Sequence, residues 1–323
     1  MNRFQEYLAD EFAEDYEEGR LSRREALKLI AAVSGSMVLA SSILAACTPP
    51  ETDAPAAAPG NTSPPEEAAL PSASETPASQ VEESSAPGTV SPDDPAITAG
   101  FVQFPGNDEA PLSGYIAYPA EQGPFPVVLV CHENRGLTAH IQDVTRRLAR
   151  AGYVGLAIDL LSRQGGTDEV SSSNVPGVLG SIDPQQFVED FLSGWQYLGE
   201  QDFAQAARVG MVGFCFGGGV TWLMATRMPE LKAAVPYYGP HPPVEDVPAI
   251  NAPVLGIYGE RDQRITQGVP AIEAAMIENQ KIFEKVIYPN ADHAFHNDTG
   301  SRYMPEAATD AWQRTLAWFA EHL

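Results

Sequence analysis

Basic residues and cysteines are both scarce in this sequence. It has 19 Lys and Arg against 43 Asp and Glu, a net charge of −24, and no Lys or Arg between Lys28 and Arg135. Without a basic patch the chain cannot neutralise phosphates, which argues against a nucleic-acid partner. The three cysteines, Cys47, Cys131 and Cys215, do not make a disulfide framework, so each needs its own explanation. With 323 residues, 44% of them hydrophobic, the chain can build a full core in one large or two small domains.

Residues 48–95 also lack aromatic and basic side chains. This segment consists mostly of Pro, Ala, Ser, Thr, Glu and Asp. Such a composition cannot bury enough apolar surface to offset the entropy lost on ordering. The sequence therefore predicts a disordered, extended tether between the first 47 residues and a folded domain at 96–323.

The first 47 residues contain a long apolar run, from Leu29 to Ala46, with eighteen uncharged residues. The preceding segment, Ser22 to Lys28, resembles a twin-arginine export motif, although Ala26 stands where that motif prefers Phe. The end of the run, 44–47, resembles a bacterial lipobox, in which Cys47 would become the lipidated first residue of the mature protein. We therefore expect an export signal and a protein tethered to the outer face of the cell membrane.

Two other interpretations of this segment remain open. The run could be a plain transmembrane anchor with an incidental Cys47, and the basic residues before it would then keep the N-terminus cytoplasmic. The protein could also be a cytoplasmic hydrolase without a signal. The long acidic region ahead of the run has Phe4, Leu8, Phe12 and Tyr16 at fourfold spacing, which indicates a short amphipathic helix of unassigned function.

From residue 96 onward, short apolar runs alternate with helical patterns. This alternation predicts an α/β fold of the α/β-hydrolase type, with a mostly parallel sheet covered by helices on both faces. The first two strands are expected to be an antiparallel pair, and Asp183 is a plausible helix N-cap. The expected strands are 100–104, 113–118, 126–131, 153–158, 209–212, 233–238, 253–258 and 283–288, and the expected helices are 141–150, 184–198, 218–224, 272–279 and 305–322.

The segment 213–217, Gly-Phe-Cys-Phe-Gly, lies between an expected strand and an expected helix. Strand, Gly-x-nucleophile-x-Gly turn and helix form the nucleophile elbow of α/β-hydrolases. The turn imposes strained dihedral angles on the central residue, and a Cβ at Gly213 or Gly217 would collide with a neighbouring element. The following helix begins beneath the sulfur of Cys215, where its dipole favours a thiolate. The sequence therefore predicts Cys215 as a nucleophile rather than a buried structural cysteine.

Two later loops supply partners for such a nucleophile. Asp262 follows the expected strand 253–258, and His293 follows the last strand, which gives the order nucleophile, acid, histidine of the α/β-hydrolases. An imidazole must take the thiol proton, and a carboxylate must orient that imidazole and stabilise its cation. Alternatives lie close by in the sequence: His296 for the histidine, and Glu260 and Asp292 for the acid.

The loop after strand 126–131 is the place where α/β-hydrolases put the second amide of the oxyanion hole. We therefore expect the backbone N–H groups of Phe216 and Asn134 to form this hole. Glu133 is unusual there, because a carboxylate would oppose a developing negative charge unless it moved or paired.

Taken together, residues 133–136, the segment 159–164, the Cys-containing elbow and residues 293–295 resemble the dienelactone hydrolase family, over about residues 97–323. The resemblance implies a triad of Cys215, His293 and Asp262, with no cofactor. It also implies that Glu133 contacts the resting thiol and is displaced by substrate, and that Arg163 binds a substrate carboxylate. Asn297 stands where the family has a second arginine, which puts the dienelactone substrate itself in doubt.

Tyr238 ends its expected strand and could either pack there or line the substrate pocket, whereas Cys131 is expected to be a buried apolar residue. No ligand spacing predicts a metal site. The hypothesis is a membrane-tethered hydrolase that cleaves a small ester or lactone through a thioacyl intermediate on Cys215. The alternative is a non-catalytic, membrane-tethered lipoprotein that binds a small molecule in a hydrolase-like pocket.

Overall fold

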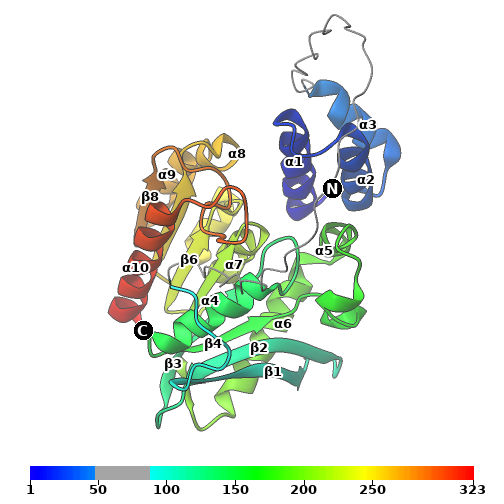
Figure 1. The fold of residues 1–323 in the computed structure, drawn as a ribbon. Helices are drawn as coiled ribbons and strands as arrows, with labels where there is room; N and C mark the ends of the chain where they lie inside the picture. Colours follow the sequence, from blue (N-terminus) through cyan, green and yellow to red (C-terminus); the bar gives the residue numbers. More distant parts are fainter. Residues whose placement is uncertain (48–87) are drawn as a thin grey trace, which may run out of the picture.

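The structure is a computed structural model that describes residues 1–47 and 88–323 (Figure 1). Its centre is an eight-stranded sheet with the order β1-β2-β4-β3-β5-β6-β7-β8. The strands are β1 (Ile97–Pro105), β2 (Pro111–Pro119), β3 (Phe125–Cys131), β4 (Val154–Ile158), β5 (Ala204–Phe214), β6 (Ala233–Tyr237), β7 (Val254–Gly259) and β8 (Phe283–Tyr288). All eight lie at or close to the expected positions, and β5 begins five residues earlier than the expected run.

Most of the sheet is parallel, as predicted. β1 and β2 form an antiparallel pair in which Gly100 lies opposite Ile116, and β2 joins β4 in the same sense. From β4 through β3 to β8 every pairing is parallel. Parallel strands are buried on both faces, which explains the continuous apolar runs of β3 and β6.

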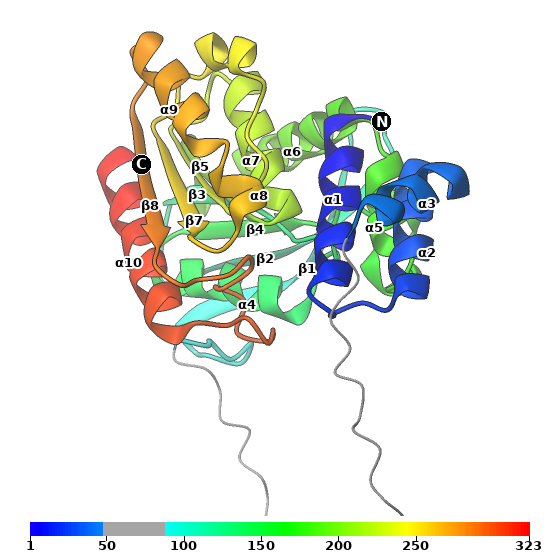
Figure 2. The ribbon, with the colours of Figure 1, turned by 90° about the horizontal axis from the view of Figure 1, so that it is seen from above.

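Helices cover both faces of this sheet. Figure 2 shows α4 and α10 on one face and α6, α7 and α9 on the other. The helices that follow β1 in the sequence are α4 (Ala139–Arg150), α5 (Val175–Ser181), α6 (Pro184–Gly199), α7 (Phe216–Arg227), α8 (Gln263–Thr266), α9 (Val269–Glu278) and α10 (Pro305–His322). Short 3₁₀ turns are η1 (Ser162–Gln164), η2 (Thr167–Glu169) and η3 (Val244–Ala249). The Asp183 side chain accepts a hydrogen bond from the Gln185 amide and caps α6, as expected.

Three further helices precede the sheet: α1 (Arg3–Glu17), α2 (Arg23–Ser34) and α3 (Met37–Ala46). Both views place them beside α5, at the edge of the sheet where the parallel strands have their carboxyl ends (Figures 1 and 2). The expected amphipathic helix is α1, in which Phe4, Leu8, Phe12 and Tyr16 are all buried. The contact between α2 and α5 is close, since a Cβ added at Gly177 of α5 would lie 2.9 Å from the Cβ of Ala32 of α2.

The long apolar run is not one helix. It is divided at Gly35, which has a φ of 67° and ends α2 in the left-handed region. Ser22, within the expected export motif, is the N-cap of α2 and forms a capping box with Glu25. Among the described residues, none of the helices has the length and apolar character needed to cross a membrane.

The predicted tether lies mostly outside the described residues. Its last part, from residue 88 onward, contacts the hydrolase domain: the Val90 amide donates to Asp143 at 2.8 Å, and its carbonyl accepts from Arg146 at 2.6 Å. Val90, six residues before the expected start of the domain, therefore already makes specific contacts with α4.

Candidate active site

Cys215 occupies a sharp turn between β5 and α7. Its φ of 58° and ψ of −121° lie in a region that side-chain-bearing residues rarely adopt. The flanking glycines are required by close packing: a Cβ at Gly213 would lie 2.1 Å from the carbonyl oxygen of Gly217, and one at Gly217 would lie 2.5 Å from that of Cys131. The sequence prediction of a strained elbow with no room at either glycine is confirmed. Phe216 is the first residue of α7, where backbone N–H groups have no partner within the helix.

Asp262 and His293 meet beside this turn. His293 Nδ1 lies 2.6 Å from Asp262 Oδ2, and both residues are almost fully buried. Polar atoms of His293 and Cys215 lie within 4.8 Å of each other. The structure thus brings together the three residues that sequence reasoning selected from three separate loops.

The sequence alternatives lie elsewhere. Glu260 is exposed and accepts a hydrogen bond from the Asn290 amide, and Asp292 lies 3.8 Å from Arg261. His296 is buried beneath the site and stacks on Phe214 at 5.1 Å. Burial, with His140 and Arg147 nearby, holds its pKa well below the usual range, so it is a neutral packing residue.

The loop that carries His293 is fixed to α4 by charged contacts. Asp298 accepts hydrogen bonds from His140, at 2.8 Å, and from Arg147. Arg147 also pairs with Asp143 on its own helix. These contacts hold the loop five residues after His293 and therefore help to fix the position of the imidazole.

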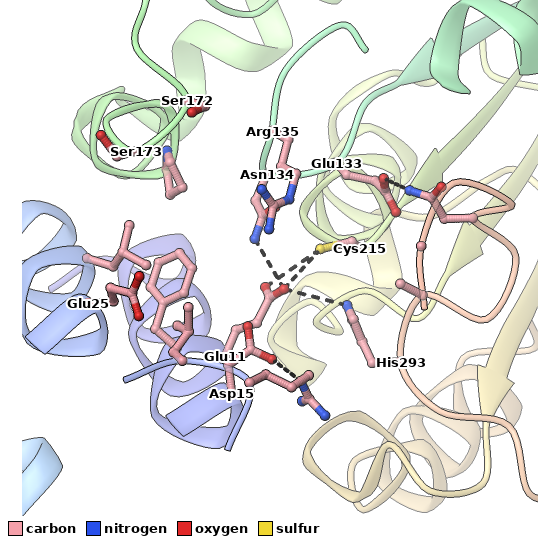
Figure 3. Close-up of a pocket in the computed structure, with 18 of the residues that line it drawn as sticks. Glu11, Asp15, Glu25, Glu133, Asn134, Arg135, Ser172, Ser173, Cys215 and His293 are labelled. Atoms are coloured by element: carbon pink, nitrogen blue, oxygen red, sulfur yellow. Dashed lines mark hydrogen bonds and ion pairs between the residues drawn. The ribbon is translucent and has the colours of Figure 1, made fainter. Parts of the chain in front are cut away.

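Two residues from α1, which sequence reasoning did not select, contact the same atoms. The Tyr7 hydroxyl lies 3.2 Å from Cys215 Sγ and 3.3 Å from His293 Nε2. The Glu11 carboxylate lies 3.6 and 3.7 Å from Sγ and 4.0 Å from Nε2 (Figure 3). Both belong to the buried face of α1, and Glu11 is an acid among apolar residues, seven positions after Phe4. An acid on the apolar face of a helix is the one sequence signal that could have pointed to this contact.

These neighbours set the protonation of the site. Burial raises the pKa of the Cys215 thiol and Glu11 raises it further, whereas His293 acts in the opposite direction. Burial lowers the pKa of His293, but Asp262 and then Cys215 more than reverse this effect and bring it to about 10. Burial and Glu11 therefore oppose the thiolate form of Cys215, whereas Asp262 favours a protonated His293.

Glu133, expected to contact the resting thiol, lines the same cavity as Cys215, and its gating role stays a prediction. Its carboxylate accepts a hydrogen bond of 2.6 Å from Asn297, whereas the carboxylate in contact with the thiol belongs to Glu11. Asn134, expected at the oxyanion hole, donates from its side chain to Glu11 Oε1 at 3.1 Å. Asn297 thus pairs with Glu133 at the position where the family has an arginine.

Arg163 and Tyr238, expected to bind substrate, are engaged elsewhere in the protein. Arg163 pairs with Asp108 at 2.7 Å and with Asp190 at 2.9 Å, and it does not line the cavity at Cys215. Tyr238 is fully buried, with its ring 5.0 Å from that of His293. Its hydroxyl has no hydrogen-bond partner among the described residues. Their substrate-binding roles stay predictions.

The two remaining cysteines differ in their surroundings. Cys131 is completely buried at the end of β3, as expected for an apolar residue. Cys47 follows α3 and is partly exposed, with its thiol 3.5 Å from the carbonyl oxygen of Ile43.

A cavity of about 980 Å³ lies between the N-terminal helices and the loops after β3 and β8. Figure 3 shows Cys215 and His293 on one wall and Glu11, Asp15 and Glu25 on the other. Among the described residues, Glu11, Cys215 and His293 could hold a metal ion, because their ligand atoms lie within 4.8 Å of one another. The Tyr7 hydroxyl, however, contacts both the sulfur and the imidazole and fills the space between them.

Comparison with known proteins supports the fold and the family. The model of the dienelactone hydrolase family matches residues 112–323. A "Putative carboxymethylenebutenolidase" of Methylorubrum extorquens is 37% identical over 247 residues, which cover 72% of this chain and 84% of that protein. A "Probable 2-oxo-3-(5-oxofuran-2-ylidene)propanoate lactonase" of a Bradyrhizobium species is 32% identical, over 70% of this chain and 96% of that protein.

The crystal structure of a "Putative Dienelactone Hydrolase" from Klebsiella pneumoniae is similar to this one, with a TM-score of 0.66 and 36% identity. The match covers all of that chain and 70% of this one. The three N-terminal helices precede the range that the family model matches. From the extent and identity of these matches, the chain belongs to the dienelactone hydrolase family.

Proposed function

We propose that the protein hydrolyses a small carboxylic ester or lactone through a thioacyl intermediate on Cys215. The observation that carries this proposal is the buried pair of His293 and Asp262, with Nδ1 and Oδ2 2.6 Å apart, beside a cysteine in a strained elbow. An elbow of this kind presents its nucleophile to a substrate, whereas a structural cysteine needs no such backbone strain.

The steps follow from the chemistry of these groups. His293 takes the proton of the Cys215 thiol, and the thiolate attacks the carbonyl carbon of the ester. The backbone N–H groups of Phe216 and Asn134 stabilise the resulting oxyanion. His293 then protonates the departing alkoxide, which leaves a thioester on Cys215. Water, deprotonated by His293, cleaves this thioester and releases the carboxylic acid. Asp262 orients the imidazole and stabilises its cation throughout.

The substrate class follows from the relatives and from one local difference. The relatives carry the names "Putative carboxymethylenebutenolidase" and "Probable 2-oxo-3-(5-oxofuran-2-ylidene)propanoate lactonase", and both names denote hydrolysis of a cyclic ester. Here Asn297, and not an arginine, lies beside Glu133, and Arg163 is paired with Asp108 and Asp190. We therefore expect a lactone or ester whose recognition depends less on a free carboxylate than that of a dienelactone.

The test is turnover of a panel of small esters and lactones. Because α1 covers the thiol, the assay uses both the full chain and the displaced-helix variant Phe4→Asp/Leu8→Asp, in which two buried apolar anchors become charged. Each is compared with its Cys215→Ala counterpart, and mass spectrometry after acid quenching locates the acyl group. Equal rates with and without Cys215 in both backgrounds would overturn the proposal. A thiol that stays inert to iodoacetamide in the displaced-helix variant would favour the small-molecule-binding alternative.

We further propose that the chain is exported and tethered to the outer face of the membrane. The support is the sequence: Ser22 to Lys28, the apolar run to Ala46, and Cys47 after it. The partly exposed Cys47 and the exposed apolar side chains of Met37 and Val38 on α3 are compatible with contact with a membrane or an export component. Fractionation of cells, with the mass of the N-terminal peptide, tests this proposal. Intact chains found only in the cytoplasm would overturn it. Lipidation would be overturned if the Cys47→Ser variant were cleaved at the same position as the wild type and found in the same cell fraction.

A further inference from the structure

The catalytic face of the hydrolase domain has an occupant in this structure, the N-terminal helix α1. We propose that this face is a binding site for α1 and that the docked helix inhibits the enzyme until it is displaced. The inference rests on the proposed role of Cys215 as nucleophile. It concerns residues 3–17, which precede the range shared with the family model.

The docking is anchored by aromatic packing. Phe4 is 2% exposed, and its ring lies 5.6 Å from that of Phe187 and 5.1 Å from that of Phe216. Leu8 is completely buried and, like Val33 of α2, lies against Gly180 of α5. Side chains of this size contribute strongly to an interface when they are fully buried. These contacts place the helix directly over the first turn of α7.

Charged contacts fix the helix further along its length. Arg264, two residues after Asp262, pairs with Glu14 at 3.2 Å and lies over the Tyr7 ring at 4.5 Å. At the N-terminal end, the Arg3 guanidinium donates to the carbonyl oxygen of His241. The contacts therefore extend from one end of α1 to the other, which is typical of a specific site and not of a single incidental touch.

With the helix in this position, two of its side chains fill the space that a substrate needs. The Tyr7 hydroxyl contacts both Cys215 Sγ and His293 Nε2, the two atoms between which the thiol proton must move. The Glu11 carboxylate lies beside the sulfur and accepts from Asn134, in the loop expected to bind the oxyanion. A carboxylate there resembles the acid product of the proposed reaction. It also opposes formation of a thiolate through charge repulsion.

Cleavage at the predicted lipobox would release the helix. If the Ala46–Cys47 bond is hydrolysed as the lipobox predicts, water adds across that peptide bond, and α1 to α3 become a separate peptide. An intramolecular helix is held at a high effective concentration, which is lost once the connection is cut. Export and activation would then be linked, although inhibition by α1 does not depend on this step.

The experiment compares the full-length wild type, the displaced-helix variant and a matched surface variant, Phe101→Asp/Leu39→Asp. Phe101 is 67% exposed and Leu39 36% exposed, so the same residue types gain the same charges away from the site. Two rates are measured for each: alkylation of Cys215 by iodoacetamide, located by mass spectrometry, and turnover of the ester and lactone panel. We expect both rates to rise about tenfold or more in the displaced-helix variant and to stay at the wild-type level in the surface variant.

The outcomes separate this inference from the proposed function. Equal alkylation of Cys215 in wild type and displaced-helix variant would overturn inhibition by α1, whatever the turnover. Equal turnover that still depends on Cys215 would also overturn it and leave the hydrolase proposal standing. Faster alkylation without any turnover would support docking over the thiol and count against the hydrolase.

If circular dichroism shows that the displaced-helix variant does not fold, the variant Tyr7→Ala/Glu11→Ala is used in its place. It keeps Phe4 and Leu8 but removes both groups that contact the sulfur. Its alkylation rate is expected to rise several-fold over wild type, and an unchanged rate would overturn the proposal.

Discussion

The sheet-edge loops and the N-terminal helices contribute to the same site in different ways. Cys215, Asp262 and His293 follow β5, β7 and β8 at the same edge of one sheet, so the fold itself brings them together. Tyr7 and Glu11 reach the site only because α1 packs across it, more than 200 residues away in sequence. Changes in the first region should therefore lower activity, whereas changes in the second should raise it.

The largest effect is expected from Cys215→Ala in the displaced-helix background. Loss of the nucleophile should reduce turnover at least about 10³-fold, because no other group forms the covalent intermediate. The measurement is the initial rate of ester or lactone hydrolysis, with the wild-type cysteine in the same background as control. A residual rate above about a tenth of the control would show that the elbow cysteine is not the nucleophile.

Asp262→Asn should act in the same direction with a smaller effect. Asparagine keeps the shape of the side chain but cannot stabilise the imidazolium of His293, so a loss of roughly 10²–10⁴-fold in turnover is expected. Glu260→Gln, an exposed acid two residues away, is the matched control and should retain the parent rate. Equal losses in the two variants would assign the effect to the loop as a whole.

Glu11→Gln tests the second region and should have the opposite sign. Tyr7 and Glu11 of α1, with Glu133 and His293 from the loops, are the polar groups that act on the thiol. Burial and then Glu11 raise the pKa of Cys215, so removing the Glu11 charge lowers it. A larger fraction of Cys215 is then thiolate at any pH below the midpoint of its titration. The alkylation curve should move to lower pH, with a rate gain of up to about tenfold near neutrality.

The control for this prediction is the same substitution in the displaced-helix variant. There Glu11 no longer faces the sulfur, so Glu11→Gln should leave the pH profile unchanged. A shift of equal size in both backgrounds would contradict the docking of α1 over the thiol.

The contrast between the two regions also explains what the sequence could predict. The strands, helix α10 and the elbow follow from local patterns: apolar runs, helical periodicity and the glycines at 213 and 217. The amphipathic character of α1 was equally local and was predicted. Its partner was not, because periodicity identifies a buried face without saying what buries it.

The same limit applies inside the hydrolase domain. Glu133 and Arg163 were assigned roles through the resemblance, but their partners in the structure are Asn297, Asp108 and Asp190. The two residues of each pair are separated by many positions in the sequence. The partner that each side chain finds therefore depends on which distant residue the fold brings to it, and local sequence patterns do not show this. The apolar run to Ala46 was interpreted as one segment, whereas Gly35 lets it fold back as two helices.

The smallest expected effect concerns the position of the His293 loop and uses Asp298→Asn. Asp298 has a pKa held well below its usual range by His140 and Arg147, against the effect of burial. Because the pKa is lower in the folded state, this carboxylate stabilises the fold above its unfolded pKa, and the contribution is lost as the pH falls through the folded value.

Asparagine should therefore lower the free energy of unfolding by about 1–3 kcal/mol at neutral pH, with a smaller difference from wild type as the solution is acidified. Urea unfolding at pH 7 and at successively lower pH values measures this. Asp310→Asn removes a more exposed carboxylate that pairs with Arg314 on α10 and should cost less. If only the Asp298 variant also loses turnover in the displaced-helix background, the ion pair positions the imidazole in addition to stabilising the fold. If turnover is unchanged, the loop holds His293 by its packing alone, and the catalytic region depends still more on the sheet than on individual charges.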